Sequence, residues 1–197
     1  MRELLLGPQR SSDLCRALPR ASSNIVADRP GELEGHGVVA RRTLPPPAGS
    51  VVYERTPWGR ELEPVVLALG GWSIRAPQPP GRPTLSPTSV LLFLRGGAQV
   101  DPAAPAAEHR FELDGTVWAV RTQGGEVRVE PGEPTTTPDA TLRTDPLTLN
   151  DVLADPRSLD AAVADRRAEV GGDVRALRAA ARVGQLIEEP RRSGALP

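Results

Sequence analysis

The segment Ser22–Thr56, SSNIVADRPGELEGHGVVARRTLPPPAGSVVYERT, carries the strongest structural signal in the chain. Ser22 or Ser23 can cap a helix that begins just after it, because a short hydroxyl side chain accepts a hydrogen bond from the free amides of the first turn. Two β-prone runs, 38–44 and 50–56, then flank a proline-rich tip and predict a hairpin. A capped helix followed by an arginine-bearing hairpin is typical of a winged helix-turn-helix.

Helices are predicted on both sides of this segment. Ser11 or Ser12 can cap a short helix, and the dipeptide Thr56-Pro57 is a cap and first-turn signature for a later one. The later helix carries apolar residues at helical spacing, namely Leu62, Val65, Val66, Leu69 and Trp72. Pro64 must either kink that helix or mark its true start, because an interior proline removes a backbone hydrogen bond.

Five motifs follow one another along the N-terminal part of the chain. They are Arg2-Glu3-Leu4-Leu5-Leu6-Gly7-Pro8, Ser12-Asp13-Leu14, Ser22-x-Asn24-x-x-Ala27-Asp28-Arg29, Leu33-Glu34-x-x-Gly37-Val38-Val39 and Tyr53-Glu54-x-Thr56-x-x-Gly59. This ordered series resembles the HxlR-type transcriptional regulators over about residues 1–75. The resemblance implies a regulator that binds double-stranded DNA as a homodimer.

The capped helix and the basic hairpin indicate where DNA contacts are expected. Free N–H groups and small polar side chains at a helix start suit a major groove, and wing arginines suit phosphates. The expected DNA-binding residues are Ser22, Ser23, Asn24, Asp28, Arg29, Arg41, Arg42 and Arg55. Ordinary helix capping and a solvated strand face are the competing interpretations of these serines and arginines.

Two departures from the family pattern support an alternative function. The family has a further helix before Arg2, whereas this sequence starts at Met1. Pro30-Gly31 falls within the expected recognition helix, where the proline costs about 3 kcal/mol or more and the glycine roughly 1 kcal/mol. We therefore predict that this helix bends or stops near Arg29. On the alternative reading, the chain does not bind DNA and acts as a ligand-binding or protein-interaction module.

A proline-rich linker is predicted to divide the chain. Four prolines fall within residues 76–83, so this stretch can form neither a helix nor an inner strand. The expected organisation is a winged helix-turn-helix domain over 1–76, a linker over 77–83, a second domain over 84–186 and a disordered tail over 187–197.

The second domain is predicted to have an α+β fold. Ser86-Pro87 opens a helix, and the alternation of apolar and charged residues that follows predicts antiparallel strands with turns at 114–115 and 124–125. Three helices are expected after the strands: one starting at Thr148, one over 159–170 and one capped by Asp173. A helix, an antiparallel sheet and closing helices form a layer that can enclose an apolar pocket.

Several motifs of this domain are shared with a known type of lipid-binding domain. They are Asp114-Gly115-x-x-Trp118, Pro138-Asp139-Ala140-Thr141-Leu142, Thr144-Asp145 and Gly171-Gly172-Asp173. Together they resemble the sterol-carrier-protein type of domain over residues 111–183, which implies a small hydrophobic effector or a dimer surface. The candidate pocket residues are Leu91, Phe93, Phe111, Leu113, Trp118 and Val120; for Trp118, a core anchor is the competing interpretation.

Composition limits the remaining function classes. The 24 basic and 25 acidic residues leave a net charge of −1, so any DNA contact must be local. The single cysteine, Cys15, excludes an internal disulfide and a zinc site with several thiolates, and we expect it to be buried. His36 and His109 are expected at the surface beside turns. We therefore expect a cytoplasmic protein without a membrane span, catalytic residues, metal or cofactor.

Overall fold

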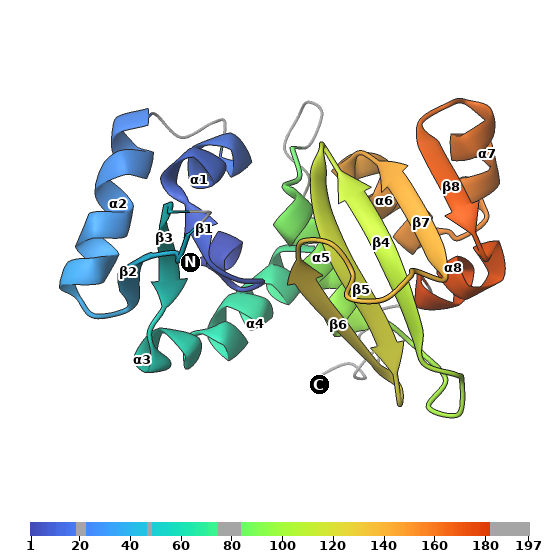
Figure 1. Ribbon diagram of the computed structural model, residues 1–197, viewed down its shortest axis with the longest axis horizontal. Helices are drawn as coiled ribbons and strands as arrows, with labels where there is room; N and C mark the ends of the chain where they lie inside the picture. The colour runs from blue at the N-terminus through green and yellow to red at the C-terminus, as the bar shows by residue number, and fades with distance from the viewer. Residues whose placement is uncertain (19–22, 47–48, 75–83, 182–197) are drawn as a thin grey trace, which may run out of the picture.

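The computed structural model describes residues 1–18, 23–46, 49–74 and 84–181. It has the predicted α+β class, with an N-terminal unit around a three-stranded sheet and a C-terminal unit around a five-stranded sheet (Figure 1). None of the helices in the described part of the chain is long and apolar enough to cross a membrane.

The N-terminal unit follows the predicted order of two helices, a hairpin and further helix. Its elements are η1 (Arg2–Leu4), β1 (Gln9–Arg10), α1 (Ser11–Ala17), α2 (Ser23–Gly35), β2 (Val39–Thr43), β3 (Val51–Arg55), α3 (Pro57–Arg60) and α4 (Glu63–Ile74). β2 and β3 form the predicted antiparallel hairpin, and β1 pairs with the other edge of β3. A small core of Leu4, Leu14, Val38 and Val39 holds the unit together.

Helix α2 does not stop where the sequence predicted. It continues through Pro30 to Gly35 (Figure 1), so of the bend or stop predicted near Arg29, the stop was wrong. Proline imposes a φ near −65°, which a helix also uses; its penalties in a helix are the missing N–H and the clash of its ring with the carbonyl four residues earlier. Pro30 is buried, and α2 contacts both α1 and β2. Tertiary packing of this kind supplies most of the stability of a helix in a protein.

The helix caps confirm some predicted starts and correct others. Thr56 caps α3 as predicted, because its Oγ1 accepts a hydrogen bond from the amide of Gly59 at 3.0 Å. Arg10, and neither predicted serine, is the N-cap residue of α1, and no side chain bonds to that helix start. Pro64 is the second residue of α4 and therefore marks the start of this helix instead of kinking it.

The C-terminal unit begins with a helix and continues into the larger sheet. Its elements are α5 (Pro87–Gly97), β4 (Ala107–Leu113), β5 (Thr116–Gln123), β6 (Glu126–Pro131), β7 (Ala140–Thr144), α6 (Pro146–Ala154), α7 (Ser158–Ala164), β8 (Ala168–Gly172) and α8 (Val174–Ala180). The strand order is β6-β5-β4-β7-β8. Both predicted turns have the positive φ angles of tight hairpins, at 114–115 and 124–125.

The five-stranded sheet is mixed, which corrects the prediction of an antiparallel sheet. β4, β5 and β6 are antiparallel, but β7 pairs with β4 in parallel. The reason is the crossover after β6, which carries the chain to the far side of β4 so that β7 runs in the same direction. Arg110 and Glu108 on β4 hold this crossover, through Glu133 (2.8 Å) and Thr136 (3.2 Å).

Two helix assignments in this unit are also corrected. The helix expected over 159–170 ends early, and β8 follows it as the fifth strand. Arg166 between them has a φ of +58°, which a right-handed helix cannot contain. Asp145, not Thr148, starts α6, and its Oδ1 accepts a hydrogen bond from the amide of Leu147 at 2.9 Å. Asp173 caps α8 as predicted.

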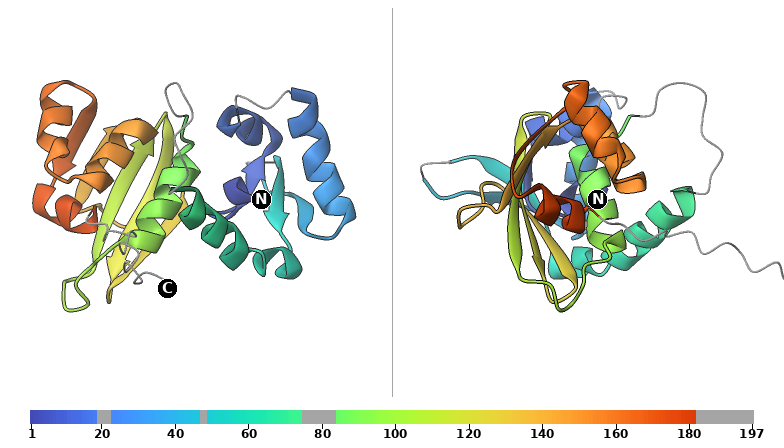
Figure 2. Two further views of the ribbon diagram at one scale, coloured as in Figure 1. Left: turned by 180° about the vertical axis from the view of Figure 1, so that it is seen from behind. Right: turned by 90° about the vertical axis from the view of Figure 1, so that its right-hand side faces the viewer.

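The helices of the C-terminal unit lie on one face of the five-stranded sheet and leave its other face open (Figure 2). The main core fills the space between helices and sheet and includes Leu91, Phe111 and Val120. Leu5 and Leu6, although they come from the N-terminal unit, belong to this same core. The two units are therefore joined by a shared hydrophobic core as well as by the chain itself.

Candidate nucleic-acid interface

Helix α2 and the β2–β3 hairpin lie at the end of the molecule remote from the five-stranded sheet (Figures 1 and 2). Gly37, with a φ of +71°, turns the chain from α2 into the hairpin, and the amide of Val38 donates to the carbonyl of Leu33 at 2.9 Å. At the end of the hairpin, Thr56 Oγ1 donates to the carbonyl of Gly37 at 2.7 Å. These bonds hold the helix and the hairpin in a fixed relation.

The expected contacts on α2 are only partly visible. Ser22 lies outside the described residues, and so do the side chains of Ser23 and Asn24, which begin the helix. Asp28 and Arg29 follow on the next turn and are exposed. The Arg29 Nη1 lies 2.6 Å from a Glu32 carboxylate oxygen, so a neighbouring acid already balances its charge.

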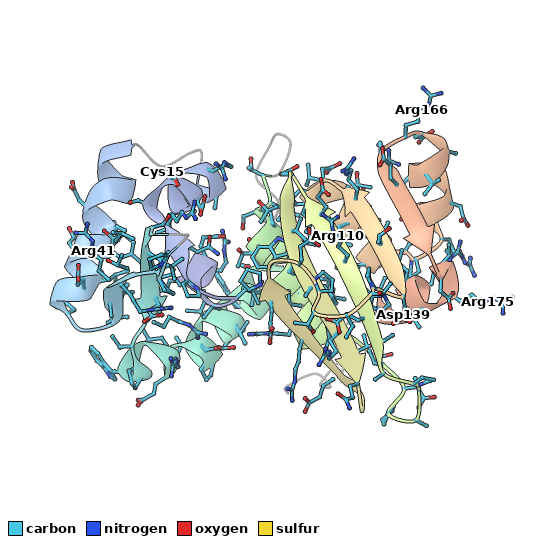
Figure 3. The ribbon with its side chains drawn as sticks, viewed as in Figure 1. Cys15, Arg41, Arg110, Asp139, Arg166 and Arg175 are labelled. Atoms are coloured by element: carbon cyan, nitrogen blue, oxygen red, sulfur yellow. The ribbon has the colours of Figure 1, made fainter. Side chains whose placement is uncertain are left out.

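The two wing arginines lie on opposite faces of the hairpin. Arg41 pairs with Tyr53 across the sheet and Arg42 with Val52, and successive side chains of a strand point to opposite faces. The Nε of Arg42 donates to a carboxylate oxygen of Glu54 at 3.0 Å. Arg41 is exposed, has no ion-pair partner among the described residues, and stands at the outer side of the N-terminal unit (Figure 3). Among the described residues of the wing, Arg41 is therefore the arginine whose charge is not paired.

Arg55 points away from the exposed face of the hairpin. Its side chain is 14% exposed, and its Nη1 lies 2.6 Å from a carboxylate oxygen of Glu63. Its Nη2 donates to the carbonyl of Leu5 at 3.1 Å. A phosphate contact would require both interactions to break, so the geometry argues against the contact expected from the sequence. The strand position was predicted correctly, but the direction of the side chain depends on its contacts with Leu5 and Glu63.

The six candidate pocket residues are packed in or against the main core instead of lining a cavity. Leu91, Phe111, Leu113, Trp118 and Val120 are buried, and Phe93 is partly buried beside them. A shallow hollow does exist on the open face of the sheet, lined by Arg121, Gln123, Glu126 and Arg128. The lining of this hollow is polar and includes none of the six.

His109 is buried, so the expectation that it lies at the surface was wrong. It is completely inaccessible to solvent on β4, and neither ring nitrogen has a hydrogen-bond partner in the described part of the chain. Burial lowers its pKa, against the opposing charge of Asp139, and the ring is therefore neutral at pH 7. The indole Nε1 of Trp118, which is on β5 and on the same face of the sheet, is also buried without a partner among the described residues. The alternation of His109 with the apolar Phe111 and Leu113 was the signal that could have revealed its burial.

Cys15 and His36 complete the residues singled out in the sequence. Cys15 is a free, exposed thiol, which corrects the expectation that it is buried. Its neighbour Leu14 takes the buried position of α1, and the adjacent position on a helix necessarily points in another direction. His36 is exposed after the end of α2, as expected.

Apolar residues of α3, α4 and the turn between them are exposed. They alternate at intervals of four and three residues, and we call them the α4 seam: Trp58, Leu62, Val65, Leu69 and Trp72. Trp72, for example, is 62% exposed. Val66, which was also among the apolar residues at helical spacing, packs against the main core. A stripe with this spacing is the kind that pairs with another helix.

Comparison with known proteins identifies the N-terminal part of the chain. Residues 1–79 match a family model described as HxlR-like helix-turn-helix. The chain is 38% identical over 69 residues to the uncharacterized HTH-type transcriptional regulator sll1512 of Synechocystis sp. (strain ATCC 27184 / PCC 6803 / Kazusa), covering 35% of this chain and 51% of that protein. It is 35% identical over 71 residues to the uncharacterized HTH-type transcriptional regulator YvaP of Bacillus subtilis (strain 168), covering 36% and 66%. The chain thus spans between about half and two thirds of these relatives.

The C-terminal part is structurally similar to SCP2-like domains. One such solved structure is titled UbiJ-SCP2 Ubiquinone synthesis protein, with 18% identity and a TM-score of 0.35, covering 64% of this chain and 91% of that chain.

Proposed function

Because residues 1–79 are an HxlR-like helix-turn-helix domain, we propose that this protein is a regulator of transcription that binds double-stranded DNA as a homodimer. One observation carries the proposal: helix α2 lies beside a wing whose Arg41 is exposed and unpaired among the described residues. A free guanidinium is well suited to a phosphate, because its fork of N–H donors matches the phosphate oxygens.

In the proposed complex, the first turn of α2 enters the major groove. Ser23 and Asn24 then read base edges, and Arg41 binds a phosphate beside the groove. Arg42 contributes less, because Glu54 already occupies its guanidinium. Arg55 makes no DNA contact; it fixes the base of the hairpin instead.

The α4 seam is proposed as the surface on which two copies dimerise. Its five apolar side chains are exposed, while Val66 packs against the main core. A 3–4 spacing buries a continuous seam when two helices pair, and burial of apolar surface gains about 25 cal/mol per Å². Pairing through this seam supplies the two-fold symmetry that regulators of this type use to bind two half-sites.

The C-terminal unit is proposed to sense a small apolar effector that carries a hydrogen-bonding group. Three buried ring nitrogens, two of His109 and one of Trp118, have no partner in the core. A buried polar group left without a partner costs about 1–3 kcal/mol, so a ligand with a polar group that hydrogen-bonds to one of these nitrogens would be favoured. Binding requires the packed core to open, since the candidate pocket residues are in contact with one another.

Fluorescence anisotropy with labelled DNA from upstream of the gene tests the proposed function. We expect saturable binding at low salt that weakens steeply as salt is added, because phosphate contacts release counterions. Arg41→Ala should weaken binding, whereas Arg143→Ala on the open face of the larger sheet should not. The absence of binding at low salt would favour the alternative, a module without DNA-binding activity. A titration with a fluorescent fatty acid, comparing wild type with His109→Leu, tests the effector separately.

A further inference from the structure

One carboxylate contacts both the base of the wing and the C-terminal unit. Glu63, on the first turn of α4, contacts the guanidinium of Arg55 from β3 and that of Arg95 from the last turn of α5. We propose that Glu63 is a positioning residue through which the C-terminal unit sets the position of the DNA-binding wing. This inference rests on the proposed function, but its physical content is a coupling that can be measured without DNA.

The geometry gives each arginine its own oxygen of Glu63. Arg55 Nη1 is 2.6 Å from Oε2, and Arg95 Nη2 contacts Oε1. All three side chains are half-buried or more, with exposed fractions of 14% to 27%. Although partial burial raises the pKa of Glu63, the hydrogen bond from Arg55 and the charge of Arg95 outweigh it and lower the pKa. Glu63 is therefore ionised at neutral pH and attracts both arginines.

A second set of contacts ties the same region to the N-terminal segment. Arg55 Nη2 bonds the carbonyl of Leu5, whose side chain lies in the main core. Ser86 Oγ, at the cap of α5, donates to a carboxylate oxygen of the buried Glu3 at 3.0 Å. Helix α5 is therefore linked to the N-terminal unit at both of its ends, through Ser86 and through Arg95.

This arrangement makes α5 the part of the C-terminal unit whose movement reaches the wing. α5 packs against β6 and α6, and its Leu91 and Leu94 are in the main core. An effector that enters that core must shift α5, and a shift of α5 moves Arg95 relative to Glu63. Glu63 also contacts Arg55, which is the last residue of β3. A movement of Arg95 relative to Glu63 therefore alters the contacts at the base of the hairpin that carries Arg41. Coupling between sites needs a physical connection with two arrangements, and the Glu63 pairs can form or break.

Three substitutions can distinguish a positioning role of the Glu63 contacts from a role in DNA contact or in stability alone. Arg95→Met removes the guanidinium through which the C-terminal unit contacts Glu63, and it leaves the Arg55–Glu63 pair intact. Arg95→Lys keeps one positive charge and serves as the conservative variant. Arg143→Met is the matched control, because Arg143 also pairs with two carboxylates, those of Glu112 and Glu169, but on the open face of the larger sheet.

Hydrogen exchange of the full-length protein, followed by mass spectrometry, tests the coupling. We expect Arg95→Met to speed exchange of the wing strands 39–43 and 51–55 by about fivefold or more, while strands β4 and β5 keep their wild-type rates. Arg95→Lys should restore most of the protection, and Arg143→Met should leave the wing unchanged. In the anisotropy assay, Arg95→Met should weaken DNA binding without changing the salt slope, because no phosphate contact is removed.

The outcomes separate the two proposals. If the wing exchanges at its wild-type rate in Arg95→Met, the coupling is refuted even when the protein binds DNA. A uniform increase over the whole chain also refutes it, because Arg95 would then contribute only to global stability. If wing exchange rises selectively but wild type does not bind DNA, the regulator function fails and the coupling stands.

Discussion

Gly59 at the start of α3 lies directly against the carbonyl of Val38, where the hairpin begins: a Cβ at Gly59 would be 1.9 Å from that oxygen. Gly59→Ala must therefore push α3 away from the hairpin, at a cost of about 1–3 kcal/mol or more. Urea unfolding of the purified protein measures the loss.

A second glycine provides the control for this measurement. A Cβ at Gly70, within α4, would meet nothing within 4 Å. Because alanine is the better helix former, Gly70→Ala should stabilise the protein by roughly 0.5–1 kcal/mol. Equal effects of the two substitutions would contradict the close approach of Gly59 to Val38.

Arg41 should matter more for DNA binding than its neighbour Arg42. Arg41→Ala removes a free charge and should reduce the slope of log affinity against log salt by about one. Arg42→Ala should have a smaller effect, because Arg42 is paired with Glu54. Anisotropy titrations at several salt concentrations measure both slopes, and a larger change for Arg42 would reverse the assignment.

Leu5 should stabilise the C-terminal unit although it lies in the N-terminal segment. It is 3% exposed within the main core, so Leu5→Ala should cost about 2–5 kcal/mol of unfolding free energy. Leu67→Ala is the control, since Leu67 is exposed on α4. If Leu5→Ala is as harmless as the control in urea unfolding, the shared core does not exist in solution.

The oligomeric state should depend on the α4 seam. Leu69→Glu places a charge in the middle of the seam and should convert a dimer to a monomer in sedimentation velocity experiments. Val163→Glu, at an exposed apolar residue of α7, should leave the dimer intact. If both substitutions dissociate the dimer, or if neither does, the α4 seam is not the dimer interface.

His109 should make the stability of the protein depend on pH. Its pKa in the folded state is lowered, chiefly by burial, so the unfolded chain binds a proton at a higher pH than the folded chain does. Stability is therefore complete above the unfolded pKa of about 6.5 and is lost as the pH falls below it, by at most about 1.4 kcal/mol per pH unit. His109→Leu should flatten the slope of unfolding free energy between pH 7 and 5. A slope identical to that of wild type would show that His109 is already protonated or accessible.

The parts of the fold that were predicted correctly depend on residues close together in the chain. Thr56 followed by Pro57 marked the start of α3, and the turn at 114–115 marked the β4–β5 hairpin. Four residues of the α4 seam, all except Trp58, were recognised by their helical spacing, but their exposure was not predicted. A local pattern indicates that side chains share a face of a helix or strand. It does not indicate whether another part of the protein covers that face.

Caps, turns and alternation were enough to establish the α+β class and the hairpin that carries Arg41 and Arg42. They could not establish that Arg55 turns inward to Glu63, that Leu5 enters the core of the other unit, or that β7 lies parallel to β4. Each of these features depends on segments far apart in the sequence. Such segments meet only when burial of apolar surface and pairing of charges offset the conformational entropy lost in bringing them together.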